Sequence, residues 1–145
     1  MERRINVRGI IVYEDKLLCV RLTNYREEKA PDYWCVPGGG LDINESILTA
    51  LNRELIEELG VKPKIGKLLY IHQYKDSKCE QLELFFHIEN PEDYLDIDLK
   101  KATHGIDEIE KVEFIDPATN NILPKFLTTE AIDINQTVVK FYSYI

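Results

Sequence analysis

The segment that decides the fold is residues 39–61, which reads GGLDINESILTALNRELIEELGV. Leucines recur along it at helical spacing, and they predict an amphipathic helix with one buried face. Asn44 can cap the start of this helix, and Glu45 in the first turn favours the same start. Gly60 predicts the end, because glycine readily adopts the left-handed conformation that follows a helix. The leucines of the apolar face are Leu48, Leu51, Leu55 and Leu59.

The same helix carries glutamates on one face. Glu54, Glu57 and Glu58 fall within about 100° of arc, because residues three and four apart share a helix face. They lie beside the leucine face, and Arg53 can pair with Glu57 four residues further on. Carboxylates that converge in this way suit Mg²⁺ or Mn²⁺. For a generic helix, the alternative interpretation is an ordinary solvated acidic face.

The composition is that of a globular protein with a sizeable core. The chain has 145 residues, 44% of them hydrophobic and 30% charged, which predicts a single domain over residues 1–145. Its net charge of −8 argues against binding to nucleic acid duplexes, which normally needs a basic face. A phosphate ligand would need a divalent cation to bridge the like charges. Without a membrane-length apolar run or a signal-peptide core, we expect a cytoplasmic protein that does not contact membranes.

The cysteines and histidines give no metal motif. Cys19, Cys35 and Cys79 are odd in number and lack CxxC spacing, which argues against a disulfide framework and a zinc site. The histidines at positions 72, 87 and 104 lie far apart in the sequence. We expect them to be structural residues at or near the surface.

Strand-like segments occur on both sides of the predicted helix. Alternating or short apolar runs bounded by turn residues predict strands, and the first two should form a hairpin. We expect a loop at residues 23–32, an irregular acidic segment at 90–105, a second helix within 120–129, and a strand or short helix at 137–145. Mixed strands with two helices predict an α+β or α/β domain. The predicted strands are residues 7–13, 17–22, 65–74, 81–88 and 111–115.

Two residues upstream of the helix stand at fixed distances from its charged cluster. Gly39 and Glu45 extend the cluster into the pattern G-x5-E-x7-R-E-U-x-E-E-x-G-U, where U is a bulky aliphatic residue. This pattern is the Nudix box, and each of its fixed positions is filled. The sequence therefore resembles the Nudix hydrolases, and the preceding WCVPGG at residues 34–39 resembles the usual lead-in to the box. Asp42 and Asn44 depart from the glutamate and glycine of many members, but neither change removes a ligand.

The resemblance implies a metal site built on the box. Glu54, Glu57 and Glu58 match the metal-binding glutamates of the family. The backbone carbonyl of Gly38 matches a further ligand, and Arg53 matches the arginine that orients the glutamates.

The resemblance also implies the surrounding fold. It implies an α/β/α sandwich with a central mixed sheet between helices, and a substrate cleft beside the box. Glu45 matches a glutamate that braces the loop by bonding backbone groups. Gly39 and Gly60 match structural positions of the motif.

Site residues outside the box are expected from the same resemblance. Many members use a further acidic residue before a later strand, as a metal ligand or as a base for water. Glu108 is the first choice and Glu110 the second, while a plain acidic loop is the alternative. Arg21 matches a position that often contacts substrate phosphate, and Arg26 in the following loop could do the same. For both arginines, an ordinary surface cation is the alternative.

The activity that the resemblance implies is hydrolysis of a pyrophosphate bond in a nucleoside diphosphate linked to another moiety. Water attacks phosphorus, and Mg²⁺, for which Mn²⁺ can substitute, bridges the phosphates and activates water. The substrate would be a small-molecule nucleotide, and a homodimer is common among relatives. The alternative is a catalytically silent nucleotide-binding or regulatory module, which often loses box glutamates. This chain keeps them all.

Overall fold

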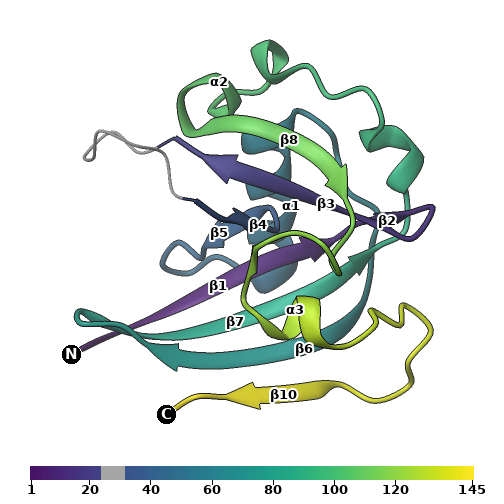
Figure 1. Ribbon diagram of the computed structural model, residues 1–145. Helices are drawn as coiled ribbons and strands as arrows, with labels where there is room; N and C mark the ends of the chain where they lie inside the picture. The colour runs from purple at the N-terminus through teal and green to yellow at the C-terminus, as the bar shows by residue number, and fades with distance from the viewer. Residues whose placement is uncertain (24–31) are drawn as a thin grey trace.

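The computed structural model describes residues 1–23 and 32–145, apart from the side chain of Ile106 (Figure 1). It has a mixed α+β fold, as the sequence predicts, with its strands divided between two sheets. Within the described residues, no helix is long and apolar enough to cross a membrane.

The first sheet has the strand order β10-β6-β7-β1-β5. β1 pairs in parallel with β7 and antiparallel with β5, while β6 pairs antiparallel with β7 and parallel with β10. The turn between β6 and β7 is closed by Asp76, whose Oδ1 accepts from the backbone N–H groups of Lys78 and Cys79 at 2.8 Å. The strands are β1 (Glu2–Ile10), β5 (Gly38–Gly40), β6 (Ile65–Lys75), β7 (Cys79–Ile88) and β10 (Lys140–Ser143).

The second sheet has the order β2-β3-β4-β9, and β8 pairs with β3 on its other side (Figure 1). The β2–β3 pair is the predicted hairpin, and both of its turn residues, Glu14 and Asp15, have positive φ. The predicted strand at residues 7–13 is divided, because β1 ends at Ile10 and β2 begins at Val12 in the other sheet. The strands are β2 (Val12–Tyr13), β3 (Lys16–Leu22), β4 (Trp34–Cys35), β8 (Ile109–Ile115) and β9 (Ile122–Leu123).

The predicted box helix is α1 (Ile47–Leu59). Its N-cap is Ser46, whose side chain accepts from the Thr49 N–H, so the prediction that Asn44 caps the helix was wrong. Asn44 instead lies in the loop before the cap, where its backbone is left-handed with φ of 65°. The end at Gly60, with φ of 74°, is as predicted.

The other helices are short. The predicted helix within residues 120–129 reduces to one turn, α3 (Phe126–Thr129), because β9 takes up the preceding residues. The segment expected to be irregular contains the 3₁₀ turns η1 (Pro91–Tyr94) and η2 (Leu99–Lys101), and α2 (Gly105–Glu108) follows. The tail contains β10, which is the strand alternative of the prediction.

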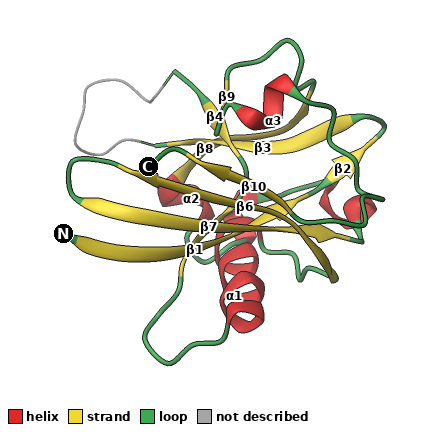
Figure 2. Cartoon of the chain, turned by 90° about the horizontal axis from the view of Figure 1, so that it is seen from below, coloured by secondary structure: helices red, strands yellow, loops and turns green. Residues whose placement is uncertain are grey.

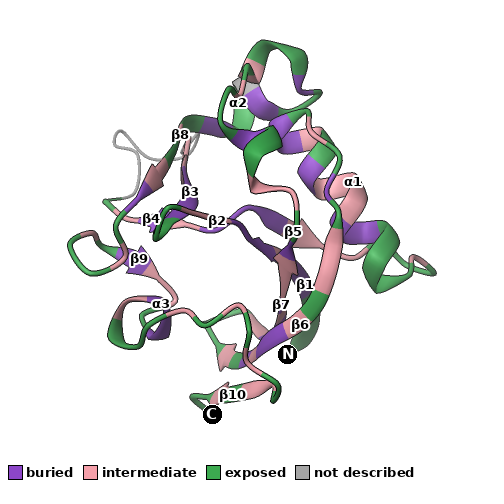
Figure 3. Cartoon of the chain, turned by 90° about the vertical axis from the view of Figure 1, so that its right-hand side faces the viewer, coloured by how far each residue is buried: buried purple, intermediate pink, exposed green. Residues whose placement is uncertain are grey.

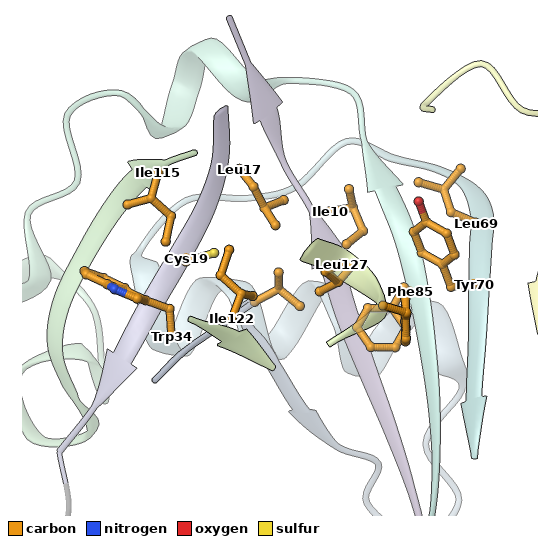
Figure 4. Packing of buried hydrophobic residues seen from close by; sticks show 12 residues of the cluster. Ile10, Leu17, Cys19, Trp34, Leu69, Tyr70, Phe85, Ile115, Ile122 and Leu127 are labelled. Carbon is orange, nitrogen blue, oxygen red and sulfur yellow. The ribbon is translucent and has the colours of Figure 1, made fainter. Parts of the chain in front are cut away.

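The core lies on both faces of the first sheet (Figure 3). On one face, Val7 and Ile11 pack with the buried residues of α1, which crosses the strands in Figure 2. Leu48 was predicted to join this face but is 53% exposed, and Ala50 is buried there instead. On the other face, Ile10 packs in a cluster between the two sheets (Figure 4). This second cluster includes Leu17, Trp34, Leu69, Tyr70, Phe85, Ile122 and Phe126.

Candidate active site

A cleft of about 560 Å³ opens beside α1, and we call it the carboxylate cleft. Its walls come from β1, β5, α1 and the α2 turn, so segments far apart in the sequence meet there. It brings together the predicted metal-binding residues Glu54, Glu57, Glu58 and Glu108 and the Gly38 backbone. The lining residues that matter below are Arg4, Asn6, Arg8, Gly38, Gly39, Glu54, Glu57, Glu58, Tyr74, Gln81, His104 and Glu108.

Arg53 is the centre of the ion-pair network on α1. Its Nε and Nη2 donate to the two oxygens of Glu45 at 2.7 and 2.8 Å. Its Nη1 donates to Glu54 and to Glu57, each at 3.1 Å, and Nη2 also donates to the Gly40 carbonyl at 3.1 Å. The predicted Arg53–Glu57 pair is therefore present, and one guanidinium fixes three carboxylates and the loop.

Glu45 ties the loop to the helix. Besides its bond to Arg53, its Oε1 accepts from the Asp42 N–H at 3.0 Å, which is the kind of backbone bond the resemblance implies. The hydrogen bonds from Arg53 and from the Asp42 backbone lower the pKa of Glu45 to about 2. Glu45 therefore stays ionised and paired at neutral pH.

Burial disfavours the ionised forms of Glu58 and Glu54. Burial raises the pKa of Glu58 to about 8, the Arg8 charge partly offsets this, and the charge of Glu54 raises it further. Burial also raises the pKa of Glu54, against the opposing effect of Arg53. The negative charge of Glu108 contributes to both shifts, so these carboxyl groups are close enough to repel one another.

The glycines of β5 let its backbone pass close to both β1 and α1. A side chain on Gly38, which has φ of 145°, would place a Cβ 2.0 Å from the Val7 carbonyl oxygen. At Gly39, a Cβ would lie 2.6 Å from the carboxylate of Glu54. The Gly38 N–H donates to Glu58 at 3.3 Å, so the loop backbone contacts the same carboxylates.

The donor set has the chemistry of a divalent cation site. Hard carboxylate oxygens gather in a cleft where burial, together with their mutual repulsion, raises the pKa values of Glu54 and Glu58, and a cation would offset both effects. Among the described residues, no group of three His, Cys, Asp or Glu side chains has the arrangement needed to hold a metal. In this arrangement Arg53 binds one oxygen each of Glu54 and Glu57, while Glu58 accepts from Gly38. Metal ligation by Gly38, Glu54, Glu57, Glu58 and Glu108 stays a prediction.

The arginines that line the cleft are not those that the sequence pointed to. Arg21 lies over the ring of Trp34, 4.9 Å from its centroid, and near Asp32, and it is not among the described lining residues. Arg26 lies outside the described residues. Arg4 and Arg8 line the cleft instead.

These missed residues had a signal in the sequence. In β1, Asn6 and Arg8 alternate with buried apolar residues, and Gln81 alternates with apolar residues in β7. Asn6 donates to Gln81 at 2.9 Å in a buried pair. Polar residues at every second position of a strand, on the side that faces the interior, indicate the wall of a cleft rather than a core.

His104 also belongs to the cleft, whereas the sequence pointed only to a structural role. Its Nδ1 lies 3.4 Å from a carboxylate oxygen of Glu57, and its backbone N–H donates to the Glu57 carbonyl oxygen at 2.8 Å. Glu108 lines the cleft from the same short turn, α2, rather than from a loop. Glu110 lies in β8 and borders a different surface hollow.

A second cavity of about 350 Å³ adjoins the first, and we call it the aromatic pocket. The two share Arg8, Leu22, Cys35 and Tyr74 as lining residues, so they lie side by side, and we call the pair the groove. The rest of the aromatic pocket is lined by Tyr33, His72, Glu83, Leu123, Pro124 and Tyr144.

Comparison with known proteins agrees with this geometry. The family model described as NUDIX domain matches residues 2–133. Diphosphoinositol polyphosphate phosphohydrolase 2 of Homo sapiens is 36% identical over 103 residues, which cover 68% of this chain and 54% of the relative. The chain thus spans about half the length of the curated relatives it matches.

Two solved structures share the fold. The E. coli ORF135 protein has a TM-score of 0.66 at 22% identity, covering 88% of this chain and 85% of its own. The MutT NUDIX hydrolase from Burkholderia pseudomallei has a TM-score of 0.68 at 18% identity, covering 92% of this chain and 100% of its own. Because the family model matches most of the sequence and the box lies in the cleft, the chain belongs to the NUDIX domain family.

Proposed function

We propose that this protein hydrolyses a pyrophosphate bond in a nucleoside diphosphate linked to another moiety, such as a nucleoside triphosphate or nucleotide sugar, and that it requires Mg²⁺. The observation that carries the proposal is the groove, in which a carboxylate-rich half adjoins an aromatic half. A diphosphate bridged by a cation suits the first half, and a flat nucleobase suits the second. Mn²⁺ is the expected substitute for Mg²⁺.

The residues of the carboxylate cleft have distinct roles in this proposal. Glu54, Glu57, Glu58, Glu108 and the Gly38 carbonyl would hold the cation. Bound there, a divalent cation supplies charge neutralisation at the phosphates and activation of water.

Arg53 and Glu108 have further roles in this proposal. Arg53 holds Glu54 and Glu57 in a fixed orientation through its Nη1. Glu108 is exposed to solvent in the cleft, which suits a carboxylate that accepts a proton from the attacking water.

A second candidate substrate is a diphosphoinositol polyphosphate, which is favoured by the name and 36% identity of the curated relative. Such a compound carries many phosphates and needs many cations around it. Among the described residues, the arginines lining the carboxylate cleft are Arg4 and Arg8, opposite four glutamates. The aromatic pocket offers a mainly apolar surface instead. The nucleotide is therefore the better match for this groove.

The alternative of a silent binding module has less support. Modules of that kind often lose box glutamates, whereas this chain retains Glu54, Glu57 and Glu58 in the cleft. The buried carboxyl of Glu58, whose pKa burial raises, is also an unfavourable feature for a merely structural helix.

The test is a substrate panel with Mg²⁺ or Mn²⁺ and a release assay for phosphate or pyrophosphate. It should include nucleoside triphosphates, nucleotide sugars, dinucleoside polyphosphates and a diphosphoinositol polyphosphate. We expect turnover of at least one nucleotide, abolished by EDTA and reduced at least about hundredfold in Glu58→Gln with the fold retained. Absence of turnover across the panel, or full activity in Glu58→Gln, would refute the proposal.

A further inference from the structure

Arg8 occupies the junction of the two halves of the groove, where it lines both the carboxylate cleft and the aromatic pocket. It lies on β1 between two other strands of the first sheet. On one side its backbone partner is Gly38 of β5, and on the other side its side chain reaches Glu83 of β7. Arg8 is thus the cation at the boundary between the cleft proposed for the diphosphate and the pocket proposed for the nucleobase.

Two of the three guanidinium nitrogens of Arg8 are already held. Nε donates to Glu83 at 2.8 Å. Nη1 donates to the Val36 carbonyl at 3.2 Å and lies 3.5 Å from the Gly38 carbonyl. Nη2 has no hydrogen-bond partner among the described residues, and the side chain as a whole is 22% exposed. The orientation is therefore fixed while donor capacity remains.

Glu83 is itself held, which keeps the arginine in place. His72, its cross-strand partner on β6, brings Nδ1 to 3.0 Å from its other oxygen. Burial opposes ionisation of Glu83, but the hydrogen bond with His72 and the charge of Arg8 outweigh it and lower the pKa. Because an ionised carboxylate only accepts, Nδ1 of His72 must carry the proton. The guanidinium is preorganised through a chain of residues across three strands.

We propose that Arg8 is a substrate-binding residue, which donates through Nη2 to the phosphate that adjoins the ring moiety. This inference rests on the proposed nucleotide function and assigns one phosphate to one residue. A guanidinium fixed in advance loses little conformational entropy on binding, so it should contribute strongly to phosphate recognition. Lysine cannot replace it, since one ammonium cannot serve Glu83, Val36 and a phosphate in this fixed fork geometry.

A purely structural role for Arg8 is the competing explanation, and it makes a different prediction. If Arg8 only neutralises Glu83, then removing both charges together should restore the protein fully. The double variant Arg8→Met with Glu83→Gln removes the buried pair without leaving an unpaired charge. It therefore avoids the misfolding that an unpaired, buried Glu83 could cause if Arg8 alone were replaced.

The experiment measures binding without metal, in EDTA, so that catalysis is not needed. AMP, GMP, CMP and UMP are titrated by calorimetry alongside the four matching nucleosides, and thermal melting verifies folding. For the wild type, we expect at least one monophosphate to bind about tenfold or more tightly than its nucleoside, equivalent to about 1.4 kcal/mol. In the double variant this ratio should fall towards one, and the nucleoside titrations correct for any change in the aromatic pocket.

Arg3→Met is the matched control, because Arg3 lies on the same strand with its side chain 85% exposed and paired with Glu80. It should leave the monophosphate-to-nucleoside ratio unchanged. A wild-type ratio in the folded double variant would overturn the inference, as would the absence of any preference for a monophosphate in the wild type. Failure of the proposed function appears separately, as absence of turnover in the substrate panel.

Discussion

Arg53 and Glu45 form a two-point ion pair across the start of α1, with Nε 2.7 Å from Oε2 and Nη2 2.8 Å from Oε1. The pair joins a loop glutamate to a helical arginine eight residues later. The same guanidinium reaches Glu54 and Glu57 through Nη1. The orientation of two predicted metal-binding carboxylates therefore depends on a bond that holds the preceding loop.

Replacing Arg53 with lysine should uncouple the loop from the carboxylates. Lysine retains the charge but not the planar fork, so we expect a loss of about 1.5–3 kcal/mol in stability, the value of a charged hydrogen bond. The kcat should fall at least about tenfold, since misorientation by a fraction of an ångström affects catalysis. Chemical denaturation and steady-state kinetics measure the two effects. Arg3→Lys, at an exposed pair, should change stability by less than about 0.5 kcal/mol, and equal effects at both sites would contradict the prediction.

Adding one methyl group at Gly39 should disable the cleft. The new Cβ would lie 2.6 Å from the Glu54 carboxylate, which Arg53 holds and cannot release freely. We expect Gly39→Ala to reduce kcat/KM by about hundredfold through displacement of Glu54. Gly66→Ala is the control, because its Cβ would meet the carboxylate of Glu89 at 2.8 Å, and that side chain is exposed and can move. Similar kinetics for the two variants would show that the contact at Gly39 has no role in activity.

The two acidic residues near the end of α2 should differ in function. Glu108 lines the carboxylate cleft, while Glu110 borders a separate hollow on the outside of β8. Glu108→Gln should therefore lower kcat by about 10²–10⁴-fold, the usual range for loss of a general acid or base. Glu110→Gln should retain wild-type kcat. Kinetics of both variants at saturating Mg²⁺ decide the matter, and the reverse pattern would transfer the role to Glu110.

The buried Glu83 should make the protein sensitive to acid. Its pKa lies below the ordinary value despite burial, owing to His72 and Arg8, so the folded state binds its proton less readily than the unfolded state does. Its stabilising contribution is present above the unfolded-state pKa of about 4.3 and is lost as pH falls through the lower folded-state pKa. Glu83→Gln should flatten the slope of unfolding free energy against pH below about pH 5.

The measurement is urea unfolding at several pH values, with the slope rather than the absolute stability as the readout. Glu83→Gln should be less stable than the wild type at every pH, because Arg8 loses its charged partner. Glu80→Gln serves as the control, since Glu80 pairs with an exposed arginine that solvent screens. If the slope of unfolding free energy against pH below about pH 5 is the same in Glu83→Gln and the wild type, Glu83 is not the source of the acid sensitivity.

The sequence of the box was enough to predict most of the helix and its charged cluster. The spacing of Leu51, Leu55 and Leu59 requires one buried helix face, and Gly60 ends the helix because it adopts positive φ. The positions of Glu54 and Glu57 on that helix then follow from helical periodicity alone. These relationships are local in sequence, so they could be read without knowledge of the fold. The cap was misjudged because Asn44 and Ser46 are both good capping residues, and only the loop path decides between them.

The groove was decided by tertiary structure. Arg8, Glu83 and His72 come from separate strands, and their contact depends on a parallel β1–β7 pairing and an antiparallel β6–β7 pairing. Strand periodicity could show that Arg8 points to the face opposite Val7, but not what lies there. Sequence by itself thus determined the carboxylates and the helix that presents them, because those contacts are a few residues apart. Which arginine enters the cleft was decided by pairing between strands some 75 residues apart in the chain.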